Sequence, residues 1–322
     1  MCTAVRFSSE EGPSFLGRNL DWSCGYSEKV RIMPKGFTLP WAFAEAAPTQ
    51  HAVIGMCVEF QNYPLFFDCG NDAGLAVAGL NHPGCAEYEP SAVKGKTNIA
   101  AYEFPAWVAA NFETVDEVEE ALASAAIVAK PFNEHFEVSY LHWIIGDASR
   151  SIVVESRADG LHVFDNPVDV LANHPNFEWH LTNLRTYITA TPNAPTPATW
   201  GRAELAPFGA GAGMRGIPGD VYSPSRFVKV AYLNAHHPAK SGEHDNVVRM
   251  FHTLSAVAMV EGASKMSNGE FEKTVYTSCF SGKTSRYYFN TYDDFAIRYA
   301  TLEGADGANP NTLVECELKE FA

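Results

Sequence analysis

The sequence predicts an α+β fold in which antiparallel sheets pack against helices. Strand patterns gather toward the two ends of the chain, and helical patterns lie mainly between them. This order lacks the regular alternation of strand and helix that marks a doubly wound parallel sheet. Hydrophobic residues make up 46% of the 322 residues and aromatic residues 12%, which is ample for a core. A chain of this length forms one large domain as reasonably as two.

Short strands fill the first 80 residues. Several of them alternate between apolar and polar side chains, and Gly, Pro, Asn and Asp separate them, as expected for strands joined by turns. These strands are predicted at residues 3–8, 14–22, 29–33, 52–60 and 74–80.

The first clear helix is predicted over residues 114–127. Thr114 followed by Glu117 has the spacing of a capping box, in which each side chain hydrogen-bonds to a free backbone N–H of the first turn. The apolar positions Val115, Val118 and Leu122 share one helix face.

The rest of the chain mixes strands and helices. A helix over residues 176–188 carries Phe177, Leu181, Leu184 and Ile188 at helical spacing. Strands at 140–145, 150–156 and 161–164 precede it, helices at 224–237 and 245–262 follow it, and strands at 275–280, 285–292 and 295–303 come last. The Pro- and Thr-rich stretch 188–201 is predicted to be an irregular excursion, and the Gly-rich stretch 209–220 a flexible loop near the mouth of the pocket.

Composition excludes several classes of function. A net charge of −15 and the absence of Lys/Arg runs argue against nucleic-acid binding. The seven cysteines have no CxxC spacing and an odd number, which favours reduced thiols in the cytoplasm over a disulfide framework. The histidines on apolar stretches, His142 and His252, are interpreted as core or surface residues and not as metal ligands. We expect no metal, no cofactor, no export signal and no membrane span.

The second residue offers the most specific chemistry. A small residue such as Cys2 allows an aminopeptidase to remove Met1, which would leave a thiol and a free α-amine on one residue. An α-amine has a pKa of about 7.7–8.0 and can take up the thiol proton near neutral pH. Taken alone, a cysteine at this position is more often an accident of composition.

Two charged residues follow within one short strand pattern. Arg18 could favour the thiolate, and Asp21 could hold the ammonium group of the processed chain. An Arg–x–x–Asp pattern is common, however, and usually forms a surface pair. Two Asn-His-Pro triplets begin at Asn81 and Asn173, and by themselves they predict only turns.

Several segments together resemble one family over nearly the whole chain. They are MCTAVRFS, LGRNLDW, GLAVAGLNHPG, VLANHPNFEWHLTNLRTY, GIPGDVYSPSRFVKVAY and YTSCFSGKTSRYYFNTYDD. In this order they are similar to bile salt hydrolases of the choloylglycine hydrolase family, and most of all to its actinobacterial members. The resemblance implies a single domain over residues 1–322 with the four-layer αββα sandwich of the N-terminal-nucleophile hydrolases, which agrees with the α+β class.

The resemblance also implies a bacterial amidohydrolase that cleaves glycine- or taurine-conjugated bile salts. Cys2 would be the nucleophile and, through its amine, the base, with the other polar residues around it. A steroid pocket and an assembly loop within 188–201, which would support a homotetramer, are implied in the same way. The implied polar site comprises Cys2, Arg18, Asp21, Asn81, Asn173 and Arg226. The implied apolar pocket comprises Leu20, Phe60, Phe67, Phe132, Phe136 and Leu141.

Two other functions compete with this hypothesis. A penicillin V acylase would use the same Cys2 chemistry on a phenoxyacetyl amide, but such enzymes tend to carry Tyr where this chain has Asn81. A non-catalytic binder of an amphipathic ligand would have no need of the polar residues together. The preference between glycine and taurine conjugates, and any acyl transfer to amino acids, depend on loop geometry that the sequence does not define.

Overall fold

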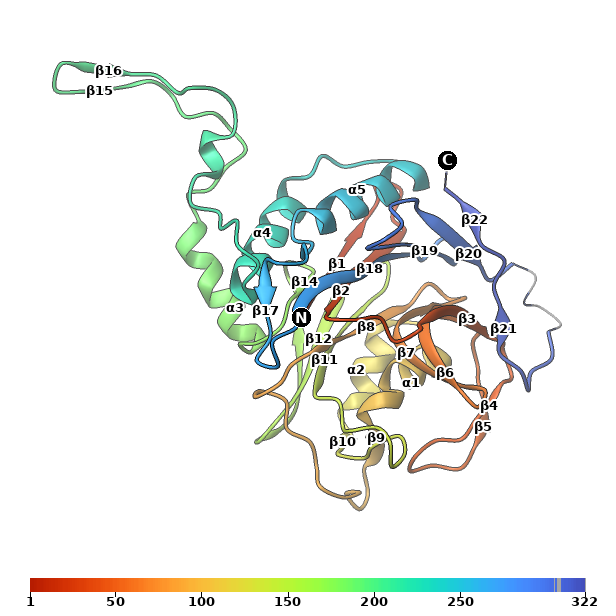
Figure 1. The fold of residues 1–322 in the computed structure, drawn as a ribbon. Coiled ribbons are helices and arrows are strands. Elements are labelled where there is room, and N and C mark those ends of the chain that lie inside the picture. Colours follow the sequence, from red (N-terminus) through yellow and green to blue (C-terminus); the bar gives the residue numbers. More distant parts are fainter. Residues whose placement is uncertain (304, 306–307, 322) are drawn as a thin grey trace.

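Two antiparallel sheets stack face to face between layers of helices in the computed structural model, which describes residues 1–303, 305 and 308–321 (Figure 1). The first sheet has the strand order β14-β1-β2-β18-β19-β20-β22, with β17 paired to β18. Its strands are β1 (Cys2–Ser8), β2 (Ser14–Trp22), β14 (Val170–Leu171), β17 (Ser264–Lys265), β18 (Phe271–Ser281), β19 (Arg286–Thr291), β20 (Arg298–Thr301) and β22 (Lys319–Glu320).

The second sheet has the order β13-β12-β11-β8-β7-β6-β3-β21. Its strands are β3 (Lys29–Met33), β6 (Val53–Phe60), β7 (Tyr63–Asn71), β8 (Ala76–Asn81), β11 (Leu141–Gly146), β12 (Ser151–Arg157), β13 (Gly160–Asp165) and β21 (Val314–Glu315). Three small pairs complete the strands: β4 (Thr38–Leu39) with β5 (Ala47–Pro48), β9 (Thr97–Ala100) parallel to β10 (Ala125–Val128), and β15 (Ala198–Trp200) with β16 (Ala203–Leu205).

Helices cover the outer face of each sheet. On the first sheet, α4 (Ser223–His236) and α5 (Glu243–Ser255) pack against β1, and α3 (Phe177–Leu184) lies beside α4. On the second sheet, α1 (Phe104–Asn111) packs against β7 and β8, and α2 (Val115–Leu122) lies near β13. Short 3₁₀ turns occur at Ala101–Glu103, Arg185–Tyr187 and Ala212–Met214. The layers are therefore αββα, which confirms the predicted fold class.

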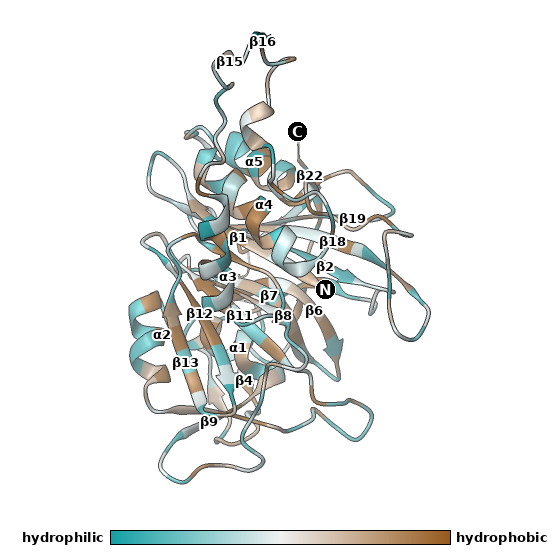
Figure 2. Ribbon diagram, turned by 90° about the vertical axis from the view of Figure 1, so that its left-hand side faces the viewer, coloured by the Kyte–Doolittle hydropathy of each residue, from teal (hydrophilic) through white to brown (hydrophobic). Residues whose placement is uncertain are grey.

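The hydrophobic residues divide into two cores because strand side chains alternate between the faces of a sheet. In β11, Ile144 points into the core shared by the two sheets and α3 to α5. Its neighbours Trp143 and Ile145 point into the core between the second sheet and α1 and α2. Figure 2 shows the hydrophobic colour on strands such as β12 and β13 and on α4.

Most predicted elements form, and the differences have local causes. The helix predicted from Thr114 ends at Leu122 because the next apolar residues, Ala125–Val128, pair with β9 instead. The Thr114 side chain caps this helix, as predicted, by accepting a hydrogen bond from the backbone N–H of Glu117. Strand β7 escaped prediction because its buried residues do not alternate and Pro64 lies near its start.

Two predictions about the middle of the chain need correction. Ile188 is predicted to lie at helical spacing at the end of a helix over residues 176–188, but the helix ends at Leu184 and Ile188 is 82% exposed. The Pro- and Thr-rich excursion is not wholly irregular, because β15 and β16 form a hairpin at its far end that projects from the body (Figure 1). Among the helices of the described residues, none has the length and apolarity that a membrane crossing requires.

Candidate active site

The thiol of Cys2 lies in the interior, at the first position of β1. Cys2 is 5% exposed and pairs with Leu20 of β2, while Ala4 pairs with Arg18. This antiparallel register brings the Arg18 side chain back toward the start of β1. The Nη2 of Arg18 donates a hydrogen bond to Cys2 Sγ over 2.6 Å.

Arg18 is held by contacts on its other side. Its Nη1 donates to the carbonyl oxygen of Gly79 at 2.8 Å, and its guanidinium lies 5.9 Å from the centre of the Tyr276 ring. Burial opposes the charge, but the attraction of Cys2, Tyr276 and Asp68 outweighs it and raises the pKa of Arg18. Arg18 is therefore a buried, permanent cation in contact with the thiol.

A buried acid, Asp68, lies near Arg18 and attracts its positive charge. Asp68 accepts hydrogen bonds from the hydroxyls of Tyr276, Tyr287 and Ser278 at 2.5, 2.6 and 2.8 Å. Burial raises the pKa of Asp68 despite these donors. Sequence reasoning did not single out Asp68, because its partners lie more than 200 positions away in the chain.

Asp21 has one satisfied oxygen and one free oxygen. Its Oδ1 accepts a hydrogen bond from the Thr274 hydroxyl at 2.6 Å. Its Oδ2 lies 3.9 Å from Arg226 Nη1 and has no hydrogen-bond partner among the described residues. Burial raises the pKa of Asp21, although Arg226 and the terminal amine act in the opposite direction. The free oxygen leaves room for one more positively charged donor.

Met1 extends the chain one residue past Cys2. Its amine donates to the Asp21 carbonyl oxygen at 2.5 Å and to Glu272 Oε1 at 2.9 Å, and its own carbonyl accepts from the Asp21 N–H at 2.8 Å. Glu272 is buried, and sequence reasoning missed it. While Met1 is present, the Cys2 nitrogen is an amide, and it donates to Asn173 Oδ1 at 2.8 Å.

The remaining polar residues close the site around Cys2. Asn173 Oδ1 also accepts from Arg226 Nη2 at 2.7 Å, and its Nδ2 donates to the Asn81 carbonyl oxygen at 2.6 Å. Arg226 Nη1 donates to the Cys2 carbonyl oxygen. Arg226 is fully buried in the first turn of α4, and burial lowers its pKa. All six predicted polar residues thus meet at one place.

The six predicted apolar residues form two groups. Leu20 and Leu141 pair with Cys2 and Asn81, and the Phe67 carbonyl oxygen lies 3.4 Å from Arg18 Nη1. The other three form an aromatic cluster, which we define as Phe60, Phe132 and Phe136. Their ring centres lie 5.6 to 6.1 Å apart in edge-to-face arrangements.

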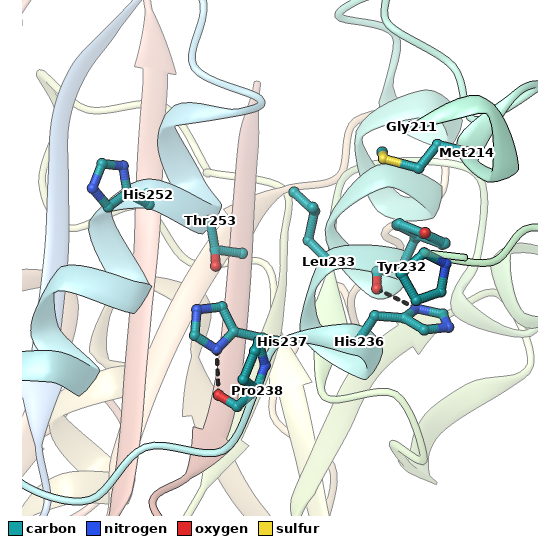
Figure 3. Close-up of a pocket in the computed structure, with 10 residues that line it drawn as sticks. Gly211, Met214, Tyr232, Leu233, His236, His237, Pro238, His252 and Thr253 are labelled. Carbon is teal, nitrogen blue, oxygen red and sulfur yellow. Dashed lines mark hydrogen bonds between the residues drawn. The ribbon is translucent and has the colours of Figure 1, made fainter. Parts of the chain in front are cut away.

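A hollow of about 340 Å³ lies elsewhere, between α4, α5 and the Gly-rich loop (Figure 3). Gly211 and Met214 of that loop face Tyr232 and His236 of α4 there, and His252 of α5 lies on the other side. None of the predicted site residues lines this hollow. The Gly-rich loop therefore belongs to a separate surface feature, and the expectation that it lies near the mouth of the pocket finds no support in its contacts.

This sandwich, with a cysteine at the head of its first strand, is that of an N-terminal-nucleophile hydrolase. The family model described as "Linear amide C-N hydrolases, choloylglycine hydrolase family" matches residues 2–311 of this chain. The chain belongs to this family and is an amidohydrolase.

Known relatives cover almost the same length. The chain is 52% identical to the "Bile salt hydrolase/transferase" of Bifidobacterium longum subsp. longum, over 95% of this chain and 96% of that protein. It is 43% identical to the "Conjugated bile acid hydrolase" of Lactobacillus acidophilus, over 94% of this chain and 96% of that protein. Its fold matches the crystal structure of a variant of conjugated bile acid hydrolase from Clostridium perfringens with a TM-score of 0.90 at 34% identity, covering 100% of this chain and 97% of that one.

Proposed function

We propose that this chain hydrolyses the amide bond of glycine- or taurine-conjugated bile salts, with the Cys2 thiol as nucleophile once Met1 has been removed. The observation that carries the proposal is the 2.6 Å contact from Arg18 to Cys2 Sγ inside a ring of buried polar groups. The names of the bile-salt-cleaving relatives support the choice of substrate.

The first chemical step forms a thioester. The Cys2 α-amine takes the thiol proton, and the thiolate, held by Arg18, attacks the carbonyl carbon of the substrate amide. The oxyanion of the tetrahedral intermediate accepts hydrogen bonds from the side-chain amide of Asn173 and from an N–H group of Asn81. The ammonium then returns its proton to the leaving nitrogen, so the C–N bond breaks and glycine or taurine departs.

The second step regenerates the enzyme. A water molecule gives a proton to the Cys2 amine and attacks the thioester carbon through the same oxyanion site. The C–S bond breaks, the thiolate recovers the proton, and the free bile acid leaves. The same amine serves as base in both steps, because it is tied to the nucleophile by the covalent geometry of one residue.

The buried charges of Asp21 and Arg226 suit a free amine on Cys2. Removing Met1 turns the Cys2 amide into a free amine, which becomes an ammonium group with additional N–H donors when it takes the thiol proton. Asn173 Oδ1 already accepts from this nitrogen, and the free Oδ2 of the buried Asp21 lies in the same polar cluster. Arg226 holds the Cys2 carbonyl oxygen, so the new chain terminus stays in place. We assign Asp21 and Arg226 to orienting the Cys2 amine and Arg18 to stabilising the thiolate.

We place the steroid against the predicted apolar residues. Leu20 and Leu141 lie next to Cys2 and Asn81 in the sheets, which suits the end of the steroid chain nearest the amide. The aromatic cluster presents Phe136, which is 38% exposed, as a surface for the rigid ring system.

We also propose a homotetramer assembled through the projecting hairpin. The segment 188–208 carries large apolar side chains that contact little of the body: Ile188 is 82%, Trp200 75% and Phe208 fully exposed. Apolar side chains gathered on one extension favour burial against another chain. The resemblance of segment 188–201 to the assembly loop of related bile salt hydrolases is the support for choosing a second copy as the partner.

We further propose that the enzyme acts in the cytoplasm. All seven cysteines are free thiols, which suits a reducing compartment. Such a compartment also keeps the Cys2 thiol available for catalysis.

The decisive experiment compares glycocholate, taurocholate and penicillin V in an amine-release assay at equal enzyme concentration. We expect turnover of at least one bile-salt conjugate at a kcat/KM well above that for penicillin V. A Cys2→Ser variant should fold with an unchanged melting temperature and lose most turnover, because an alcohol is a much poorer nucleophile near neutral pH. Preferred cleavage of penicillin V would make the enzyme an acylase, and full activity of the serine variant would refute the mechanism.

A further inference from the structure

A cluster of buried ionisable side chains lies next to Asn81 and Asn173 of the site. His82 follows Asn81 at the end of β8, while His142 of β11 and Glu155 of β12 stand beside it. All three side chains are fully buried. The rings of His82 and His142 stack with centres 3.9 Å apart and planes 11° apart. The proposed reaction uses none of these three residues.

Both ring nitrogens of His142 face oxygen acceptors. Its Nε2 lies 2.7 Å from the Ala172 carbonyl oxygen, and its Nδ1 lies 3.2 Å from Glu155 Oε1. A carbonyl oxygen and a carboxylate oxygen can only accept, so each nitrogen must carry a hydrogen to bond. An imidazole ring with hydrogen on both nitrogens is an imidazolium cation.

The alternative would be a neutral His142 beside a protonated Glu155, and the surroundings of Glu155 oppose it. Its Oε1 also accepts from the Phe177 N–H at 3.0 Å, and its Oε2 accepts from Arg157 Nη2 and Nε at 2.6 and 3.0 Å. Burial disfavours the carboxylate, but its hydrogen bonds, those from His142 and Arg157 among them, outweigh burial and lower the pKa of Glu155 to about 2. Glu155 is therefore ionised and balances a positive charge on His142.

The other histidines of the cluster are neutral neighbours. Burial and the nearby His142 lower the pKa of His82 to about 3. Burial lowers the pKa of His180 to about 4, and its Nε2 lies 2.9 Å from the Asn173 carbonyl oxygen. The cluster thus holds one ion pair, His142 with Glu155, among uncharged rings. Arg157 is the outer partner of Glu155.

We propose that His142 is a buried imidazolium and the positioning residue for Asn173, the oxyanion donor. It ties Glu155 of the second sheet to the carbonyl of Ala172, the residue immediately before Asn173. His180 bonds to the carbonyl of Asn173 itself. The backbone on both sides of the Asn173 side chain is therefore fixed, by His142 of the second sheet on one side and by His180 of α3 on the other. This role rests on the proposed function of Asn173.

A metal site is the competing interpretation of the same residues. One ligand atom each of His82, His142 and Glu155 can be chosen within 4.8 Å of one another. The stacked rings argue against it, because parallel rings direct their nitrogen lone pairs along parallel planes and not toward one point. In addition, the Nε2 of His142 is already engaged with Ala172.

Two substitutions separate the two ends of the His142 bridge. In His142→Gln, the amide can reach the Nε2 position and still donate to the Ala172 carbonyl. In His142→Asn, the shorter amide can donate only toward Glu155. We expect kcat to fall at least tenfold in His142→Asn and less in His142→Gln, with KM within twofold for both. The control is His162→Gln, which changes a half-buried histidine outside the site that is paired with Asp159 at 2.7 Å, and it should keep full activity.

A double-mutant cycle distinguishes positioning from general loss of structure. If His142 acts through Asn173, His142→Asn should lower kcat less than twofold when Asn173 is already Ala. An equal fold loss of kcat in both backgrounds would overturn the positioning role.

A measurement on the unaltered enzyme tests the cation without any variant. Histidine-selective ¹⁵N labelling, at a pH where a histidine in free solution is neutral, should show one of the 11 histidines with two protonated ring nitrogens. Finding every histidine neutral at that pH would overturn the assignment, as would one equivalent of bound transition metal whose removal abolishes activity. The nitrogen spectrum does not depend on the substrate, so its failure is distinct from a failure of the proposed function.

Discussion

Replacing Phe136 with Ala tests the placement of the steroid. A phenylalanine side chain presents roughly 200 Å², and Phe136 is 38% exposed, so about 75 Å² is free to contact a ligand. Covering that area contributes at most about 2 kcal/mol at roughly 25 cal/mol per Å². We therefore expect KM to rise by up to about 25-fold, with kcat little changed because the contact is equal in ground and transition states.

Phe132 provides the matched comparison within the same cluster. Its ring contacts Tyr63, Tyr102, Phe60 and Phe136, so Phe132→Ala should also lower the melting temperature, whereas Phe136→Ala should leave it nearly unchanged. The assay is steady-state kinetics of both variants on glycocholate and taurocholate, and both conjugates should weaken alike because they share the steroid. A collapse of kcat at constant KM, or an effect on one conjugate only, would show that this cluster is not the steroid wall.

Four further predictions follow from the site and the fold. Any residue retained in front of Cys2 should abolish turnover, because the catalytic amine becomes an amide; intact mass and activity of processed and extended protein test this. Asn173→Ala should lower kcat by about 10²–10³-fold at similar KM, as for loss of one oxyanion donor. Deleting the hairpin 198–205 should shift light scattering toward the 35.2 kDa monomer before it lowers activity. Glu155, whose pKa falls from 4.5 to about 2 on folding, should add on the order of 3 kcal/mol of stability above pH 4.5 that is lost as the pH falls toward 2.

Each of these predictions has a result that would contradict it. Full activity of an extended chain would remove the amine from the mechanism. An Asn173→Ala enzyme with normal kcat would need another oxyanion donor. A native chain that scatters as a monomer at micromolar concentration would refute the assembly. For Glu155, the free energy of unfolding should fall less steeply at acid pH in Glu155→Gln than in the unaltered chain. An unchanged slope would show that folding does not lower the pKa of Glu155.

Local sequence patterns were enough to predict most of the secondary structure. Alternation in residues 29–32 and the capping pattern at Thr114 depend only on neighbours in the chain, so they are visible before folding. The residues at which each helix or strand begins and ends were less predictable. The apolar stretch after Leu122 suits a helix or a strand, and pairing with β9 decided in favour of the strand.

The polar site was found by resemblance, because its residues are ordinary when taken singly. Arg18 lies near Cys2 through the register of adjacent strands, but Asn173 and Arg226 come from distant parts of the chain. No local rule predicts that these side chains meet, and the same is true of Glu272 beside Met1.

By itself, the sequence determined the reactive group and the layers of this protein. A cysteine at position 2, the strand and helix periods and the order of the motifs are properties of the chain, and they were sufficient to predict the fold class and to propose Cys2 as the nucleophile. Only the tertiary structure decided the electrostatics around that nucleophile: the free oxygen of Asp21 and the pairing of His142 with Glu155. The physical reason is that a side chain's charge depends on burial and on partners from other strands, and these exist only once the two sheets have stacked.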